Sequence, residues 1–309
     1  MQTGTSTTRI GATIGVVCIS FSAILVRAAQ VSPSTAAFFR AVYAIPFLTA
    51  VWWWGRGRDH RDRKSRWIAA MAGLLLALDL TIWHHSIELI GAGLATVLAN
   101  AQVVFVALAA WLVWRERPSM ATLWIGPGVI AGLILVSGLG RDDAFGSNPT
   151  LGVILGAATG ITYAGFLIVF RLATRRHDAP PAGALLDATI GAALGSLALG
   201  VVFGTISFVP TWPAHGWLVL LAVVSQVVGW LLIAVALPRL PALETSILLL
   251  IQPVAALLWA RLFFAETMSW IQATGVVMVI AGVLAISTRG ATVQRGVGDA
   301  GSLRPRRMT

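Results

Sequence analysis

Long apolar segments separated by short polar connections make up most of this chain. Ten of them have about the 20 mainly apolar residues that an α-helix needs to cross the hydrocarbon core of a bilayer. They cover residues 10–30, 33–54, 67–88, 91–114, 120–139, 150–170, 182–204, 214–237, 242–264 and 268–288. Apolar and polar residues do not alternate with a period of two, which disfavours the strands of a closed barrel. The pattern therefore predicts an all-α integral membrane protein with ten transmembrane helices.

Arginine and lysine are concentrated in every second connection. With the N-terminus inside, the inner connections and both tails hold nearly all of them, whereas the outer linker at 140–149 holds Arg141 beside two aspartates. Short cytoplasmic loops of membrane proteins carry such an excess of Arg and Lys. The distribution predicts a multi-pass protein of the cytoplasmic membrane with both termini cytoplasmic. Residues 1–9 then form an N-terminal segment, and residues 289–309 form a disordered basic tail.

The composition supports this class of protein and excludes others. The chain is 57% hydrophobic and only 11% charged, whereas soluble domains carry about 25% charged residues. Its net charge of +10 suggests nucleic acid as a partner, but the basic residues lie in short loops between apolar segments. We therefore expect a lipid bilayer and a small-molecule substrate as partners, and no nucleic acid. The single cysteine, Cys18, excludes a disulfide within the chain.

The two halves of the chain resemble each other. Residues 67–137 align with residues 217–287 without a gap, and the coincidences include polar and aromatic residues as well as apolar ones. The matched pairs include Trp67 with Trp217, Gln102 with Gln252, and Glu116 with Glu266. Each repeat holds five predicted helices, an odd number, so the second must be inverted relative to the first. We predict repeat 1 at 10–139 and repeat 2 at 150–288.

An inverted repeat has a mechanical consequence. Two copies of one unit can adopt slightly different conformations around a site near the bilayer midplane. Exchange of those conformations opens the site to the opposite side of the membrane. This mechanism, alternating access, favours a transporter over other kinds of membrane protein.

The doubled segments resemble the EamA-type permeases of the drug/metabolite transporter superfamily. They are residues 94–118 (LATVLANAQVVFVALAAWLVWRERP) and 244–267 (ETSILLLIQPVAALLWARLFFAET), each followed by a span that closes on Ala-Gly. Phe38, Phe39 and Arg40 also fit, and residues 79–87 (DLTIWHHSI) resemble one subgroup. Covering nearly all of residues 10–288, the resemblance implies ten helices, a central cavity, and export or exchange of small metabolites.

This chain differs from the EamA-type pattern in the position of proline. The family often has proline in the fourth helix, where this chain has Val103, whereas Pro253 keeps it in the ninth. We therefore expect the two repeats to bend differently.

Polar residues inside the apolar segments are the candidate site. A carboxylate at the bilayer centre costs about 3 kcal/mol on insertion scales, and Asp79 lies near the middle of the third predicted helix. It is a candidate to bind a substrate amine or to couple transport to protons; the alternative is a structural pair with Arg40 or Arg27. At about 100° per residue Trp83 and Ser86 share its face, whereas His84 lies about 140° away. His84 is either a proton relay or an interhelical hydrogen-bonding residue.

Further candidates lie on other helices. Gln102 and Gln252 are pseudo-symmetric and near the midplane, where they either bind substrate or join helices. Arg40 either has a buried structural or anion-binding role or extends to the interface. Weaker candidates are Asn100, Ser86, Pro253 as a bend or a source of a free carbonyl, and the aromatic residues Tyr163 and Trp230. Glu116 and Glu266 end their helices and are expected to be structural or gating residues.

No pattern for a metal or cofactor site is present. His84, His85 and Glu88 lack the i, i+4 spacing of a helical zinc site, and the chain has no Walker segment. We expect a secondary transporter, not an enzyme, that moves an amino-acid-like metabolite. Its coupling would be to protons, to another solute or to the substrate gradient alone, and the resemblance implies export. The alternatives are an integral-membrane enzyme with Asp79 and His84 as acid and base, or a scaffold that transports nothing.

Overall fold

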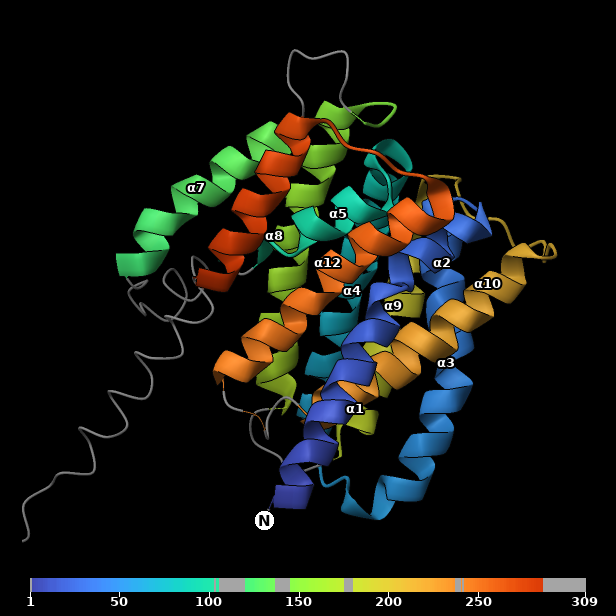
Figure 1. Ribbon diagram of the computed structural model, residues 1–309. Coiled ribbons are helices and arrows are strands. Elements are labelled where there is room, and N and C mark those ends of the chain that lie inside the picture. The colour runs from blue at the N-terminus through green and yellow to red at the C-terminus, as the bar shows by residue number, and fades with distance from the viewer. Residues whose placement is uncertain are drawn as a thin grey trace, which may run out of the picture.

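The computed structural model describes residues 2–102, 104–105, 120–136, 145–174, 180–236, 240 and 242–285, and every regular element in them is helical. The helices are α1 (Gln2–Ser20), α2 (Ser22–Ala29), α3 (Pro33–Gly55), α4 (Arg63–Ile90), α5 (Ala92–Ala99), α7 (Met120–Val136), α8 (Pro149–Thr174), α9 (Pro181–Val202), α10 (Ala214–Leu221), α11 (Trp230–Ala236) and α12 (Ala242–Phe264). Short elements η1 (Arg56–Arg58) and η2 (Ala222–Gly229) join them, and a last helix covers Trp270–Ala285 (Figure 1). The all-α prediction is confirmed for this part of the chain. Glu116, Val103 and the 289–309 tail lie outside it.

Six helical segments are long and apolar enough to cross a membrane. They are Thr7–Ala29, Pro33–Arg58, Arg63–Ile90, Pro149–Thr174, Pro181–Val202 and Ala214–Ala236. Shorter apolar helices at Leu123–Val136, Leu248–Phe264 and Trp270–Ala285 fall in three further predicted windows. The window at 91–114 is described only as far as Phe105. The chain is a multi-pass membrane protein, and its count of ten helices stays a prediction.

Local sequence fixes where two of the long helices, α3 and α4, begin. Ser32 precedes Pro33, and its hydroxyl accepts a hydrogen bond from the Thr35 amide at 3.4 Å. The Asp62 carboxylate accepts one from the Ser65 amide at 2.8 Å, which caps α4. Proline at the first helical position and a polar N-cap are both favourable, because the first amides of a helix lack partners within it.

The fourth predicted window is broken, whereas the ninth is continuous. Helix α5 ends at Ala99, and the Asn100 side chain donates to the Thr96 carbonyl at 2.8 Å. Such a local hydrogen bond competes with the helical backbone. Helix α12 runs unbroken through Pro253. The break therefore lies in the repeat that lacks the proline.

Small residues bring α4 and α9 into backbone contact. A Cβ built on Gly73 would overlap the Ala188 carbonyl, and one built on Gly191 would overlap the Ala70 carbonyl. Close approach through small residues is a common way for helices to associate in lipid. At another edge of the bundle α7 packs on the last helix through Gly132 and Gly275 (Figure 1). Helix α4 also packs along α8, so α4 is a central element of the described fold.

A buried ion cluster holds the α3–α4 connection against α9. Arg61 donates to both Asp59 carboxylate oxygens, at 2.8 and 2.9 Å, and to Asp187 of α9 at 2.8 Å. The Trp52 indole donates to Asp59 at 2.8 Å. The hydrogen bond from Arg61 is the main cause that holds the pKa of Asp59 well below its usual range. We call the end of the bundle that carries this cluster the arginine-rich end.

Replacing Gly191 with Ala tests the α4–α9 contact. We expect Gly191→Ala to lower the free energy of unfolding by about 1–3 kcal/mol, because the added methyl group forces the helices apart. Gly128→Ala is the matched control, since a Cβ there meets nothing within 4 Å. A helix gains up to about 1 kcal/mol from that change. Thermal unfolding in detergent measures both, and equal melting temperatures for the two variants would contradict the contact.

The ion cluster predicts a pH dependence. Because the pKa of Asp59 is lowered on folding, its contribution is fully present above the unfolded pKa of about 3.9. That contribution is lost as the pH falls through the lower, folded pKa. We expect Asp59→Asn to lower the melting temperature by a constant amount between about pH 8 and pH 5. The difference from the wild type should shrink below about pH 4; a difference that instead disappears near neutral pH would be inconsistent with this assignment.

Candidate functional site

A cavity of about 70 Å³ lies within the helix bundle. Polar and aromatic residues from both halves of the chain line it. The lining includes Ser22, Arg40, Asp79, Trp83, Thr96, Asn100, Gln102, Thr159, Tyr163, Trp230 and Gln252. The structure thus brings together Asp79, Trp83, Gln102 and Gln252, and with them four of the weaker candidates, Arg40, Asn100, Tyr163 and Trp230. We call this space the central cavity.

A basic and an acidic side chain, Arg40 and Asp79, face the central cavity without bonding to each other. Arg40 is 4% exposed and Asp79 is 5% exposed. The Arg40 guanidinium donates to Gln226 and to Ser22, each at 2.9 Å. Asp79 accepts from the Thr162 hydroxyl at 3.2 Å. Arg40 is therefore held inside the bundle and does not extend to the interface, while both charges remain directed at one space.

Gln226 holds Arg40 in place, and sequence reasoning missed it. It lies in η2, a π-helical segment between α10 and α11. Its side-chain amide also donates to the Thr189 hydroxyl of α9 at 3.4 Å. Short π-helical segments occur frequently at functional sites. The signal in the sequence was a glutamine within an apolar segment. Such a residue is also typical of one that only forms a hydrogen bond between two helices.

Two polar atoms in the cavity wall have no partner among the described residues. They are the indole nitrogen of Trp83, a donor, and the amide oxygen of Gln102, an acceptor. A buried polar atom without a hydrogen bond costs about 1–3 kcal/mol. Such atoms are rare in proteins and need an explanation. They are suited to bind a solute that offers one acceptor and one donor.

An aromatic wall closes one side of the central cavity. Tyr163 and Trp230 meet edge to face, with ring centroids 6.3 Å apart. Behind them lies Phe166, whose ring centroid is 5.7 Å from that of Tyr163. By contrast, Trp212 and Trp270 are 85% and 90% exposed. Tyr163 and Trp230 therefore do not belong to an interfacial aromatic belt.

The remaining candidates on α4 and α12 lie outside the cavity wall. His84 Nδ1 lies 3.1 Å from the Pro33 carbonyl, which can only accept, so Nδ1 donates a proton to that hydrogen bond. Its ring lines a larger cleft, of about 680 Å³, next to the α4–α5 turn. Ser86 donates to the Gly152 carbonyl at 2.8 Å. Pro253 follows Gln252 in α12 but is not among the lining residues. His84 and Ser86 thus join α4 to α3 and α8.

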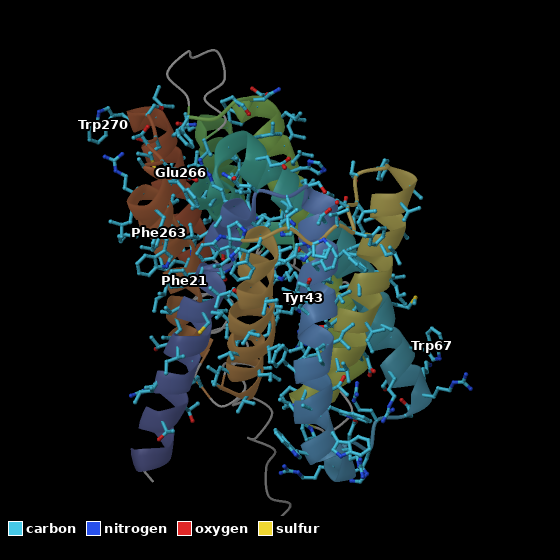
Figure 2. All side chains as sticks on the ribbon, turned by 90° about the vertical axis from the view of Figure 1, so that its right-hand side faces the viewer. Phe21, Tyr43, Trp67, Phe263, Glu266 and Trp270 are labelled. Carbon is cyan, nitrogen blue, oxygen red and sulfur yellow. The ribbon has the colours of Figure 1, made fainter. Side chains whose placement is uncertain are left out.

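Glu266 joins three elements at the end of the bundle opposite the arginine-rich end (Figure 2). Its carboxylate pairs with Arg27 of α2. It also accepts from the amides of Ala92 and Gly93, at 2.8 and 3.1 Å. A carboxylate at a helix N-terminus stabilises the unpaired amides and the helix dipole. The Arg27 guanidinium also lies 4.5 Å from the centre of the Phe264 ring. Glu266 thereby fixes the start of α5.

No group of three or more His, Cys, Asp or Glu side chains suited to a metal occurs among the described residues. The central cavity is lined instead by ionisable, amide and aromatic side chains.

Comparison with known proteins identifies the family. The profile of the EamA-like transporter family matches residues 8–138 and again residues 150–288. The chain belongs to the EamA-like transporter family. This family is part of the drug/metabolite transporter superfamily that the doubled segments resemble, so that prediction is confirmed.

Two curated relatives carry the same general description. The chain is 32% identical over 124 residues to an uncharacterized transporter of Synechocystis, covering 38% of this chain and 36% of the relative. It is 30% identical over 135 residues to an uncharacterized transporter of Archaeoglobus fulgidus, covering 44% and 47%. The matches thus span less than half the length of either relative. Both names describe transporters, not enzymes.

A solved structure shares the fold. One protein of known crystal structure matches with a TM-score of 0.62 at 16% sequence identity. The match covers 94% of this chain and 99% of that one. At this identity the match speaks for the fold alone.

The ion pair between Glu266 and Arg27 can be tested with two single substitutions and the double substitution. We expect Glu266→Gln and Arg27→Gln each to lower the melting temperature, because each leaves a partly buried charge without its partner. The double variant should lower the free energy of unfolding by less than the sum of the two single decreases. The difference, which is the coupling free energy of the pair, should be about 0.5–3 kcal/mol. Thermal unfolding in detergent of the wild type, the two single variants and the double variant measures this coupling. Strict additivity would show that the two side chains do not interact.

Proposed function

We propose that this chain is a secondary transporter that exports a small, amino-acid-like metabolite across the cytoplasmic membrane. The observation that carries the proposal is the pair of buried opposite charges, Arg40 and Asp79, that face one cavity without bonding to each other. A zwitterion offers each of them its counter-charge. Both side chains have neutral hydrogen-bond partners, but neither has a counter-charge within ion-pair distance among the described residues. A solute that brings both counter-charges is therefore favoured over a neutral or singly charged one.

The rest of the cavity wall suits the same class of solute. Its carboxylate would lie toward Arg40 and the donor on Trp83, and its ammonium group toward Asp79 and the acceptor on Gln102. An apolar side chain would contact Tyr163 and Trp230.

Alternating access between two inverted repeats is the proposed mechanism. The family profile matches twice, and the cavity takes residues from both halves: Asp79 and Gln102 from the first, Tyr163 and Gln252 from the second. We propose repeat 1 at 10–139 and repeat 2 at 150–288, with both termini cytoplasmic. A site shared by two repeats is the arrangement that alternating access requires. Asp79 is the proposed carrier of any coupled proton, since it is a carboxyl group in the cavity wall.

Replacing Asp79 with Asn tests the proposal. The amide keeps an oxygen for the Thr162 hydroxyl but removes the charge, so we expect normal folding and a loss of transport or of its pH dependence. The measurement compares metabolites in spent medium from cells with wild type, Asp79→Asn or empty vector at matched membrane levels. One amino-acid-like class should accumulate with the wild type alone.

Glu88→Gln is the matched control, because it removes one acid from the same helix at a side chain that is 52% exposed. It should export at the wild-type rate. Wild-type export and pH profile in Asp79→Asn would remove Asp79 from the mechanism. An enzyme would instead form product in detergent, whereas a transporter changes no solute and needs a sealed vesicle. Product formed in detergent would therefore overturn the transporter proposal itself.

A further inference from the structure

A groove of about 340 Å³ lies between α4 and α9 on the outer surface of the bundle. It flanks the glycine contact between the two helices. Its walls are apolar: Met71 and Leu74 of α4 are 45% and 40% exposed, and Ile190 and Leu194 of α9 are 38% and 60% exposed. In a membrane protein such a surface meets lipid. The groove runs along both helices, from Arg63 to Leu74 on α4 and from Asp187 to Leu194 on α9.

Cationic residues lie at one end of the groove. Arg63, Arg66 and Trp67 all line it and occupy the first turns of α4 at i, i+3 and i+4, which places them on one helix face. Trp67 is 57% exposed and points away from the bundle (Figure 2). Tryptophan and arginine are typical of the level of the lipid headgroups. One end of the groove thus carries residue types that are typical of the headgroup level, and the rest of its wall is apolar.

Among the described residues, the cations at this end of the groove are only partly paired with carboxylates. Asp187 also lines the groove, but Arg61 holds it at 2.8 Å. Arg66 is 42% exposed and reaches Asp59 only at 3.6 Å. Asp59 is itself hydrogen-bonded to Arg61. Among the described residues no ion pair engages Arg63.

We propose that this groove binds one anionic phospholipid. Its phosphate lies at Arg63 and Arg66, and an acyl chain follows the groove past Met71, Leu74 and Leu194. Basic residues beside transmembrane helices attract anionic headgroups. The apolar length of the groove selects a lipid over a free phosphate. This inference concerns a surface apart from the central cavity and does not depend on the proposed transport.

Native mass spectrometry of the full-length protein in detergent tests the proposal. The protein is titrated with phosphatidylglycerol and, separately, with phosphatidylcholine of the same acyl chains. We expect one phosphatidylglycerol to remain bound at concentrations on the order of tenfold below those needed for phosphatidylcholine. Arg63→Gln with Arg66→Gln should weaken that binding on the order of tenfold or more.

Arg56→Gln with Arg58→Gln is the matched control. It removes the same charge from exposed residues of η1 that do not line the groove, and it should retain phosphatidylglycerol like the wild type. Leu194→Trp, which fills the apolar part of the groove without a charge change, should also lower retention. It serves as a second test if the arginine variant does not fold.

Three results would overturn the site. One is equal retention of the two lipids by the wild type. Another is an equal loss in the η1 control, which would mean a general attraction to a basic surface. The last is full displacement by millimolar inorganic phosphate, which would mean an anion site with no contribution from the groove.

Discussion

The fold of this protein depends on how a bilayer-spanning bundle accommodates charge. Arg40 and Asp79 are buried, and hydrocarbon provides neither with a partner. Ser22 and Gln226 hold the arginine, and Thr162 holds the aspartate. These partners come from α2, η2 and α8, whereas the charges come from α3 and α4. The need to satisfy two side chains therefore fixes five elements around one space, and that space is the central cavity.

The same physical rule acts at the start of α5. Glu266 pairs with Arg27 and accepts from the first amides of α5, so this short helix is fixed at its start by a charge from another part of the chain. Helix α5 then ends where Asn100 bonds back to Thr96. The chain that follows brings Gln102 into the cavity wall. The position of that wall thus depends on a buried carboxylate that follows α12.

Periodicity and polarity in the sequence are sufficient to predict the helices and much of the cavity. Asp79 and Trp83 are predicted from one face of one helix, and both line the cavity. Ser86 lies on the same predicted face but contacts Gly152 instead, because angular position does not define depth along the helix. Pairs distant in sequence, such as Arg40 with Gln226 or Arg27 with Glu266, leave no local periodic pattern. The break at Asn100 is equally hidden, because its neighbours are apolar helix formers.

Cavity size constrains how a transporter with this architecture can work. The central cavity measures about 70 Å³, whereas ligand pockets usually measure about 300–1,000 Å³. A metabolite that binds there has to separate the surrounding helices. The crossing of α4 and α9 is in backbone contact and resists separation. The broken segment at Asn100 and the π-helical η2 have weaker or altered backbone hydrogen bonding and flank the same space. Expansion around a fixed α4–α9 pair, through these two segments, is therefore the physically favoured way to admit a solute.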